Sequence, residues 1–116
     1  MLIEVLKSKI HGARVTRTDL NYEGSLGIPE DMIEACGLYV NERIDVYNVT
    51  NGERFSTYVI KEPAGSGNFF VNGAAAHRAK KGDKIIVASY AHIEEKDIKT
   101  HKPNVIRLDE TNKIVR

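Results

Sequence analysis

The sequence predicts a mainly β fold, built as a small barrel of short strands with few, short helices. Apolar and polar residues alternate over residues 2–11, which is the side-chain period of a half-buried strand. Asn51-Gly52 lies between two further strand-like runs and is a strong signal for a tight β-hairpin. One convincing helix is expected, over residues 29–36. Many short strands joined by tight turns are typical of small β-barrels.

Length and composition favour one domain over residues 1–116. A chain of this length buries roughly two-thirds of its unfolded surface, so it can hold a core. The formal net charge is +1 without a long basic block, so we expect neither nucleic acid nor a membrane as partner. The apolar runs are too short for a transmembrane helix or a signal peptide. Cys36 is a lone cysteine, which offers no disulfide or metal framework and favours a cytoplasmic setting.

The first strand is expected over residues 2–11. Strict alternation places Lys9 and His11 side by side on one face, together with Ile3 and Val5. A solvated face is the ordinary role of such a lysine. Gly12 is expected to end this strand, and a second, polar strand follows up to Asp19.

Residues 29–36 have the marks of a short helix. Pro29 suits the first helical position, and Gly37 suits the left-handed position just beyond the end. The apolar stripe of this helix is expected to pack into the core. Its members are Met32, Ile33 and Cys36.

The predicted hairpin joins strands over residues 43–49 and 53–60. Arg54 and Tyr58 share one face of the second strand, with about 13 Å between their Cα atoms. They can therefore meet one small ligand only from opposite sides or from two subunits. Thr57 falls on the other face by alternation.

The second half of the chain is expected to alternate between strands and short helical turns. Asn72 is a good N-cap for a helix, and the small residues after it would let a carboxylate approach the helix start. His92 and His101 are expected at the surface. The remaining expected elements are a loop over 63–67, a strand over 68–71, a central strand over 84–90, a helical turn within 91–102, a strand over 104–108 and a mobile tail after Asp109.

Gly24-Ser25 is a peptide bond that can cut itself. The serine hydroxyl can attack the Gly24 carbonyl and convert the amide to an ester, and elimination then leaves dehydroalanine. Water releases ammonia from dehydroalanine and leaves a pyruvoyl group at a new chain start. Glycine suits the preceding position because it has no Cβ and accepts strained backbone angles. Most Gly-Ser pairs are ordinary turns, so the rest of the chain has to support this chemistry.

Three sequence blocks support it. Y-E-G-S at 22–25, N-V-T-N-G-E-R-F-S-T-Y at 48–58 and V-N-G-A-A-A-H at 71–77 resemble the signature blocks of aspartate 1-decarboxylase. That family makes β-alanine for pantothenate and coenzyme A with a pyruvoyl group. The resemblance runs in order along nearly the whole chain and is weakest after Tyr90.

The resemblance implies a double-psi β-barrel, a homotetramer with active sites between subunits, and a zymogen that cleaves itself into a β chain (1–24) and an α chain (25–116). It implies that Ser25 becomes the pyruvoyl group that forms a Schiff base with L-aspartate, without metal or pyridoxal phosphate. It assigns proton donation to Tyr58. Because Thr57 is implied in cleavage and in substrate binding, we expect a bulge or a twist that turns it toward the site. The other implied substrate-binding residues are Lys9, Arg54, Asn72, Gly73, Ala74 and Ala75, with His11 and Tyr22 supporting them.

Two alternatives remain open from the residues alone. A regulatory or binding module on a similar barrel would show the same hairpins, although the near-neutral charge offers it no basic face. A self-cleaving hydrolase would keep a serine at the new terminus. Intact mass separates the three cases: no cleavage, a serine terminus or a pyruvoyl terminus.

Overall fold

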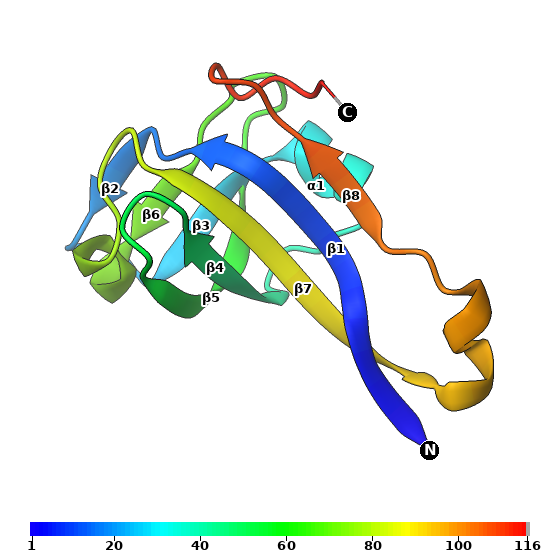
Figure 1. Cartoon of the computed structure of the whole chain (residues 1–116). Coiled ribbons are helices and arrows are strands. Elements are labelled where there is room, and N and C mark those ends of the chain that lie inside the picture. Colours follow the sequence, from blue (N-terminus) through cyan, green and yellow to red (C-terminus); the bar gives the residue numbers. More distant parts are fainter. Residues whose placement is uncertain (116) are drawn as a thin grey trace.

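A computed structural model of the chain describes residues 1–115. Eight strands form one sheet in the order β2-β6-β3-β5-β4-β7-β1-β8, and a short helix packs against it (Figure 1). The elements are β1 (Leu2–Arg14), β2 (Arg17–Asp19), β3 (Ser25–Pro29), α1 (Glu30–Cys36), β4 (Arg43–Asn48), β5 (Arg54–Glu62), β6 (Phe70–Asn72), the 3₁₀ helix η1 (Gly73–His77), β7 (Lys84–Glu94), the 3₁₀ helix η2 (Glu95–Thr100) and β8 (Asn104–Arg107). The mainly β prediction is confirmed, and closure into a double-psi barrel stays a prediction.

The long antiparallel pair β1–β7 is the spine of the sheet (Figure 1). The pairing runs from Leu2 opposite Glu94 to Arg14 opposite Lys84, and its register shifts twice. The second shift surrounds Gly12, whose φ of 89° is suited to glycine. The prediction that Gly12 ends the strand is wrong, because the glycine forms a bulge and β1 continues to Arg14.

The first register shift changes which residues share a face. Leu6 pairs with Tyr90 and Lys9 pairs with Ala88, so both lie on the face that carries Tyr90. Strict alternation had placed Lys9 with Ile3 and Val5 instead, and that grouping is wrong because the bulge adds one residue. The prediction that Lys9 and His11 are neighbours on one face is confirmed.

The helix α1 begins and ends where its capping residues predict. Pro29 is the last residue of β3 and occupies the N-cap, one position earlier than expected. Gly37 adopts φ 69°, and its N–H donates to the Glu34 carbonyl at 3.2 Å. The predicted apolar stripe is buried in the core: Met32, Ile33 and Cys36.

The predicted hairpin is confirmed between β4 and β5. Gly52 has φ 78°, and its N–H donates to the Asn48 carbonyl at 2.8 Å. The ladder is unbroken from Arg43 opposite Tyr58 to Tyr47 opposite Arg54. A bulge at Thr57 is therefore absent from this pairing, and a twist that turns Thr57 toward the site stays a prediction.

The tail after Asp109 is held to the sheet, against the prediction that it is mobile. The Asn112 side chain accepts a hydrogen bond from the Arg14 N–H at 2.7 Å. Its amide donates to the carbonyls of Arg14 at 2.9 Å and Gly67 at 2.8 Å. One buried side chain thus replaces backbone partners at the end of β1.

Two smaller expectations also change. His101 is half-buried rather than at the surface, with Nε2 2.6 Å from the Leu6 carbonyl oxygen. The strand expected over 68–71 is β6, which begins two residues later, at Phe70. Within residues 1–115, no helix is long and apolar enough to cross a membrane.

Candidate active site

Ser25 is the first residue of β3 and lies opposite Asn72 of β6. Both side chains are 1% exposed. The Ser25 hydroxyl donates to the Glu23 carbonyl oxygen at 3.1 Å and accepts from Asn72 Nδ2 at 3.1 Å. Tyr22, Glu23 and Gly24 are exposed, but Ser25 itself is fixed in the protein interior.

Asn72 serves Ser25 rather than a helix. Asn72 occupies the predicted N-cap position, before the 3₁₀ helix η1, but its side chain makes no capping hydrogen bond. Asn72 Oδ1 is buried without a hydrogen-bond partner among residues 1–115. Because buried polar atoms are normally paired, this oxygen is open to a donor group brought in by a ligand or by a rearranged chain.

The constrained glycine of the site is Gly73, not Gly24. Gly73 has φ 73°, and a Cβ there would lie 2.6 Å from both the N and the Cα of Gly24. Gly24 has no positive φ, and nothing lies within 4 Å of a Cβ built on it. The expected strain at Gly24 is therefore not seen. Gly73 allows the backbone of η1 to lie against the Gly24-Ser25 bond.

Thr57 and Tyr58 belong to the strand next to Ser25. β3 and β5 are parallel with Leu26 opposite Val59, so Ser25 and Tyr58 are the residues immediately before this pair. Thr57 pairs with the buried Ile44 and faces the core, whereas Tyr58 faces the other side of the sheet. The two predicted roles thus lie on opposite faces beside the same bond.

Arg54 lies at the other end of β5, about 13 Å from Tyr58 along the strand. Its guanidinium carbon is 4.6 Å from the centre of the Tyr47 ring. A shallow hollow of about 290 Å³ lies beside this pair, next to Asp45 and Ser56. Arg54 therefore lies away from Ser25 within one chain.

Lys9 and His11 form a third group on β1. In the sheet order, β7 and β4 separate β1 from β5. His11 Nδ1 is buried without a hydrogen-bond partner among residues 1–115. Burial, followed by the charges of Lys9, Arg107 and Lys84, lowers the pKa of His11 below its usual 6.5. The imidazole is therefore neutral at pH 7.

The structure thus collects part of the predicted site and leaves the rest apart. Ser25, Asn72 and Gly73 converge, and Tyr58 is on the adjoining strand. Ala74 is exposed and Ala75 is half-buried, both in η1. Sequence reasoning missed Tyr47 and its partner Tyr90; the aromatic residue of the hairpin, directly opposite Arg54, was the available signal.

Metal-ligating side chains do not gather anywhere in residues 1–115: no group of three or more His, Cys, Asp or Glu residues is placed to hold an ion. The residues around Ser25 are instead hydroxyl, amide and phenol groups. Such groups donate and accept hydrogen bonds at a reacting centre.

The fold and this site define a small, mainly β enzyme centred on a buried serine that follows glycine at a strand start. Comparison with known proteins agrees. The family model described as aspartate decarboxylase matches residues 1–115. The aspartate 1-decarboxylase of Caldicellulosiruptor saccharolyticus is 52% identical over 116 residues, covering 100% of this chain and 91% of its own. The protein of the same name from Burkholderia mallei is 54% identical over 111 residues, covering 95% and 87%. The chain belongs to the aspartate decarboxylase family, which is a family of carboxy-lyases.

Proposed function

We propose that this protein decarboxylates L-aspartate to β-alanine and carbon dioxide, and so supplies β-alanine for pantothenate and coenzyme A. Its prosthetic group would be a pyruvoyl group made from Ser25 by cleavage of the Gly24-Ser25 bond. The observation that carries the proposal is the buried Ser25 hydroxyl, held between Asn72 Nδ2 and the Glu23 carbonyl. A cytoplasmic location suits the buried, free Cys36 and this biosynthetic role.

The cleavage step needs no external reagent except water. The Ser25 oxygen bonds to the Gly24 carbonyl carbon, and the carbon–nitrogen bond breaks as the proton passes to the Ser25 nitrogen. Loss of the Ser25 α-proton then breaks the Cβ–O bond and frees the Gly24 carboxylate. The dehydroalanine tautomerises and takes up water, and ammonia leaves. The products would be a chain of residues 1–24 and a chain beginning with a ketone at position 25.

The residues around Ser25 fit a ketone. Asn72 Nδ2 donates to Ser25 Oγ, which would leave with the Gly24 carboxylate. This amide would then be free to donate to the ketone oxygen that replaces the nitrogen on the neighbouring Cα. The unpaired Asn72 Oδ1 lies in the same buried site and can accept a hydrogen bond from a donor group of the substrate. When present, the pyruvoyl group supplies an electron sink for the electron pair left by departing carbon dioxide.

The remaining residues would bind substrate and move a proton. Tyr58, on the strand beside Ser25, is our candidate to donate a proton to the substrate Cα. Arg54 offers a two-pronged fork to one carboxylate, and Lys9 offers a point charge to the other. Thr57 would assist cleavage from the opposite face, where its hydroxyl can stabilise charge on the Gly24 oxygen.

We also propose that the site is shared between subunits of a homotetramer. Arg54 and Lys9 are carried by parts of the sheet away from Ser25, so one aspartate cannot easily reach all three within one chain. A second copy that brings its Arg54 and Lys9 to Ser25 would complete the site. A monomer that decarboxylates aspartate in dilute solution would contradict this arrangement.

Intact mass and carbon dioxide release test the proposal together. The purified protein should show chains of residues 1–24 and 25–116 with a pyruvoyl terminus, and should decarboxylate L-aspartate without added pyridoxal phosphate. Borohydride added with aspartate should attach mass to the larger chain. Ser25→Ala removes the attacking hydroxyl, so that variant should remain one inactive chain. Cleavage of Ser25→Ala at the same bond, or a borohydride adduct on a lysine, would show that the pyruvoyl chemistry is wrong.

A further inference from the structure

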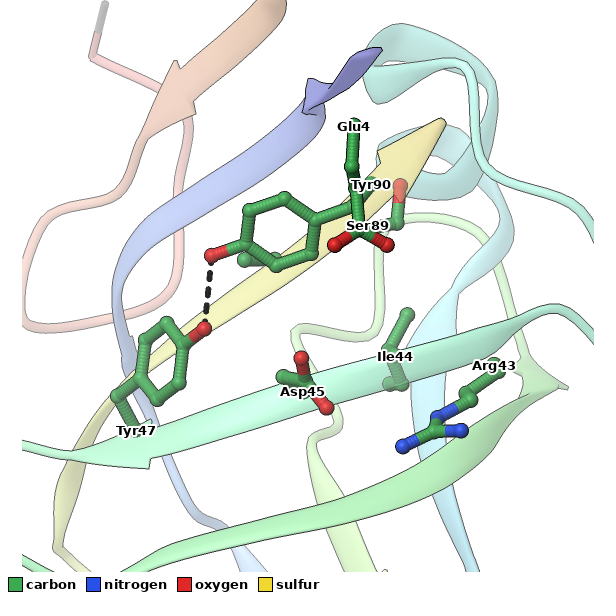
Figure 2. Close-up of a pocket in the computed structure, with 8 residues that line it drawn as sticks. Glu4, Arg43, Ile44, Asp45, Tyr47, Ser89 and Tyr90 are labelled. Carbon is green, nitrogen blue, oxygen red and sulfur yellow. Dashed lines mark hydrogen bonds between the residues drawn. The ribbon is translucent and has the colours of Figure 1, made fainter. Parts of the chain in front are cut away.

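Three side chains from three neighbouring strands form a line on the outer face of the sheet. The hydroxyls of Tyr90 (β7) and Tyr47 (β4) are 2.7 Å apart, and Arg54 (β5) lies over the Tyr47 ring at 4.6 Å. Figure 2 shows the two rings pointing their hydroxyls at each other across the sheet. The function proposed above uses only Arg54 of this line.

The tyrosine pair is not an ordinary cross-strand contact. Tyr47 pairs with Ile86 on β7, and Tyr90 is four residues further along that strand, a rise of about 13 Å. The two rings therefore lean toward each other along the strands, passing over Ala88, whose small side chain leaves room beneath them. They border a hollow of about 450 Å³ that Asp45 and Arg43 also line (Figure 2).

The Arg54 guanidinium depends on this ring for its orientation. Among residues 1–115 the guanidinium makes neither a hydrogen bond nor an ion pair, so its five N–H donors are free for a ligand. The Arg54 guanidinium lies over the face of the Tyr47 ring. Arginine loses less freedom on binding a carboxylate when its planar group is already oriented. A contact that holds the Tyr47 ring in place therefore also fixes the orientation of the Arg54 guanidinium.

We propose that Tyr90 is a positioning residue: its hydroxyl holds the Tyr47 ring in place, and that ring orients Arg54 to receive a substrate carboxylate. This inference rests on the function proposed above for Arg54. The chemistry of the pair agrees with it. The hydrogen bond to Tyr90, followed by burial, raises the pKa of Tyr47 to about 12, so the Tyr47 hydroxyl stays protonated at neutral pH and keeps this hydrogen bond.

The central test is Tyr90→Phe, which keeps the ring and removes only the oxygen. Processing at Gly24-Ser25 should be unchanged by intact mass, because Tyr90 lies away from that bond. The KM for aspartate should rise about 3- to 10-fold at nearly constant kcat, since one orienting hydrogen bond is lost from substrate binding. The matched control is Tyr39→Phe, an exposed tyrosine outside the line, which should leave both constants unchanged.

A second variant checks that Tyr90 acts through Tyr47. Tyr47→Trp keeps an aromatic face for Arg54 but removes the hydroxyl that bonds Tyr90. Adding Tyr90→Phe to Tyr47→Trp should then raise the KM no further. An equal additional rise in the double variant would overturn the proposed route through Tyr47.

A structural readout separates this inference from the function on which it rests. The Arg54 Nε–H resonance of the uncleaved Ser25→Ala protein should be shifted by the Tyr47 ring current, and Tyr90→Phe should move it toward the value of a free arginine. Tyr90→Phe should also lower the titration midpoint of Tyr47 from about 12. An unmoved Arg54 resonance would refute the positioning role even if aspartate is turned over. A moved resonance in the Ser25→Ala background, together with no carbon dioxide release from aspartate by the protein that keeps Ser25, would support the positioning of Arg54 and refute the proposed function.

Discussion

At the scale of single residues, Thr57 and Tyr58 lie on opposite faces of β5, so the roles proposed for them can differ. They are adjacent in sequence, yet β5 turns Thr57 toward Ile44 and Tyr58 to the opposite face. The parallel pairing of β3 and β5 brings both strands together at Ser25. A hydroxyl on one side can serve the carbonyl that is attacked, while a phenol on the other can serve the substrate.

We predict that Tyr58→Phe is cleaved normally but turns over aspartate about 10²–10⁴-fold more slowly, because it lacks the proton donor. Thr57→Val should be cleaved slowly, with a loss of about 3 kcal/mol of barrier stabilisation if its hydroxyl meets the developing oxyanion. Intact mass over time and β-alanine release measure the two effects. Near-normal turnover by fully cleaved Tyr58→Phe would remove Tyr58 as the acid and leave water or His11 as candidates.

At the scale of elements, the junction between β6 and η1 lies against the Gly24-Ser25 bond. Asn72 ends β6 and bonds Ser25, and Gly73 then turns η1 against Gly24. The close approach depends on the absence of a side chain at position 73. Asn72 thus supplies a hydrogen-bond donor to Ser25, and Gly73 leaves room for the backbone of Gly24.

We predict that Gly73→Ala blocks or strongly slows cleavage, because its Cβ would overlap Gly24 at 2.6 Å. Gly52→Ala is the matched control: Gly52 has a similar φ of 78°, but nothing lies within 4 Å of its Cβ. Both variants carry the backbone penalty of about 1 kcal/mol for a left-handed alanine, so only the contact differs. Cleavage is followed by intact mass, and equal rates for the two variants would exclude a role for the Gly73 contact.

At the scale of the whole molecule, Asn112 ties three distant parts of the chain together. Its amide joins the tail to the end of β1 and to the loop at Gly67. Backbone groups that would otherwise be unpaired at this corner are satisfied by one side chain. Removing the Asn112 side chain would leave the Arg14 N–H and the carbonyls of Arg14 and Gly67 without these hydrogen bonds, which destabilises the fold.

We predict that Asn112→Ala lowers the free energy of unfolding by about 1–3 kcal/mol, since three hydrogen bonds disappear with the side chain. Glu110→Ala, in the same tail but exposed, should change it by less than about 0.5 kcal/mol. Denaturant unfolding of the Ser25→Ala background at fixed protein concentration measures both changes without the effect of cleavage. Equal stability of the two variants would mean that the tail is not anchored through Asn112.

Much of the fold follows from local sequence. Alternation and the Asn51-Gly52 turn predict the strands and the hairpin, and Pro29 and Gly37 delimit the helix. The Gly24-Ser25 pair can also be singled out from the sequence, because the proposed cleavage needs only neighbouring residues. These features depend on preferences that act within a few residues of each other.

The tertiary structure decided which residues far apart in the sequence come into contact, because local patterns hold no information on long-range pairing. The bulges of β1 regroup the faces around Lys9, because one inserted residue reverses a side-chain period of two. Asn72 looked like a helix cap, but it reaches Ser25, 47 residues earlier, because sheet pairing places them opposite each other. The Tyr90–Tyr47 contact likewise depends on how β7 and β4 lie side by side. The sequence by itself determined which groups can react, and long-range strand pairing decided which of them meet.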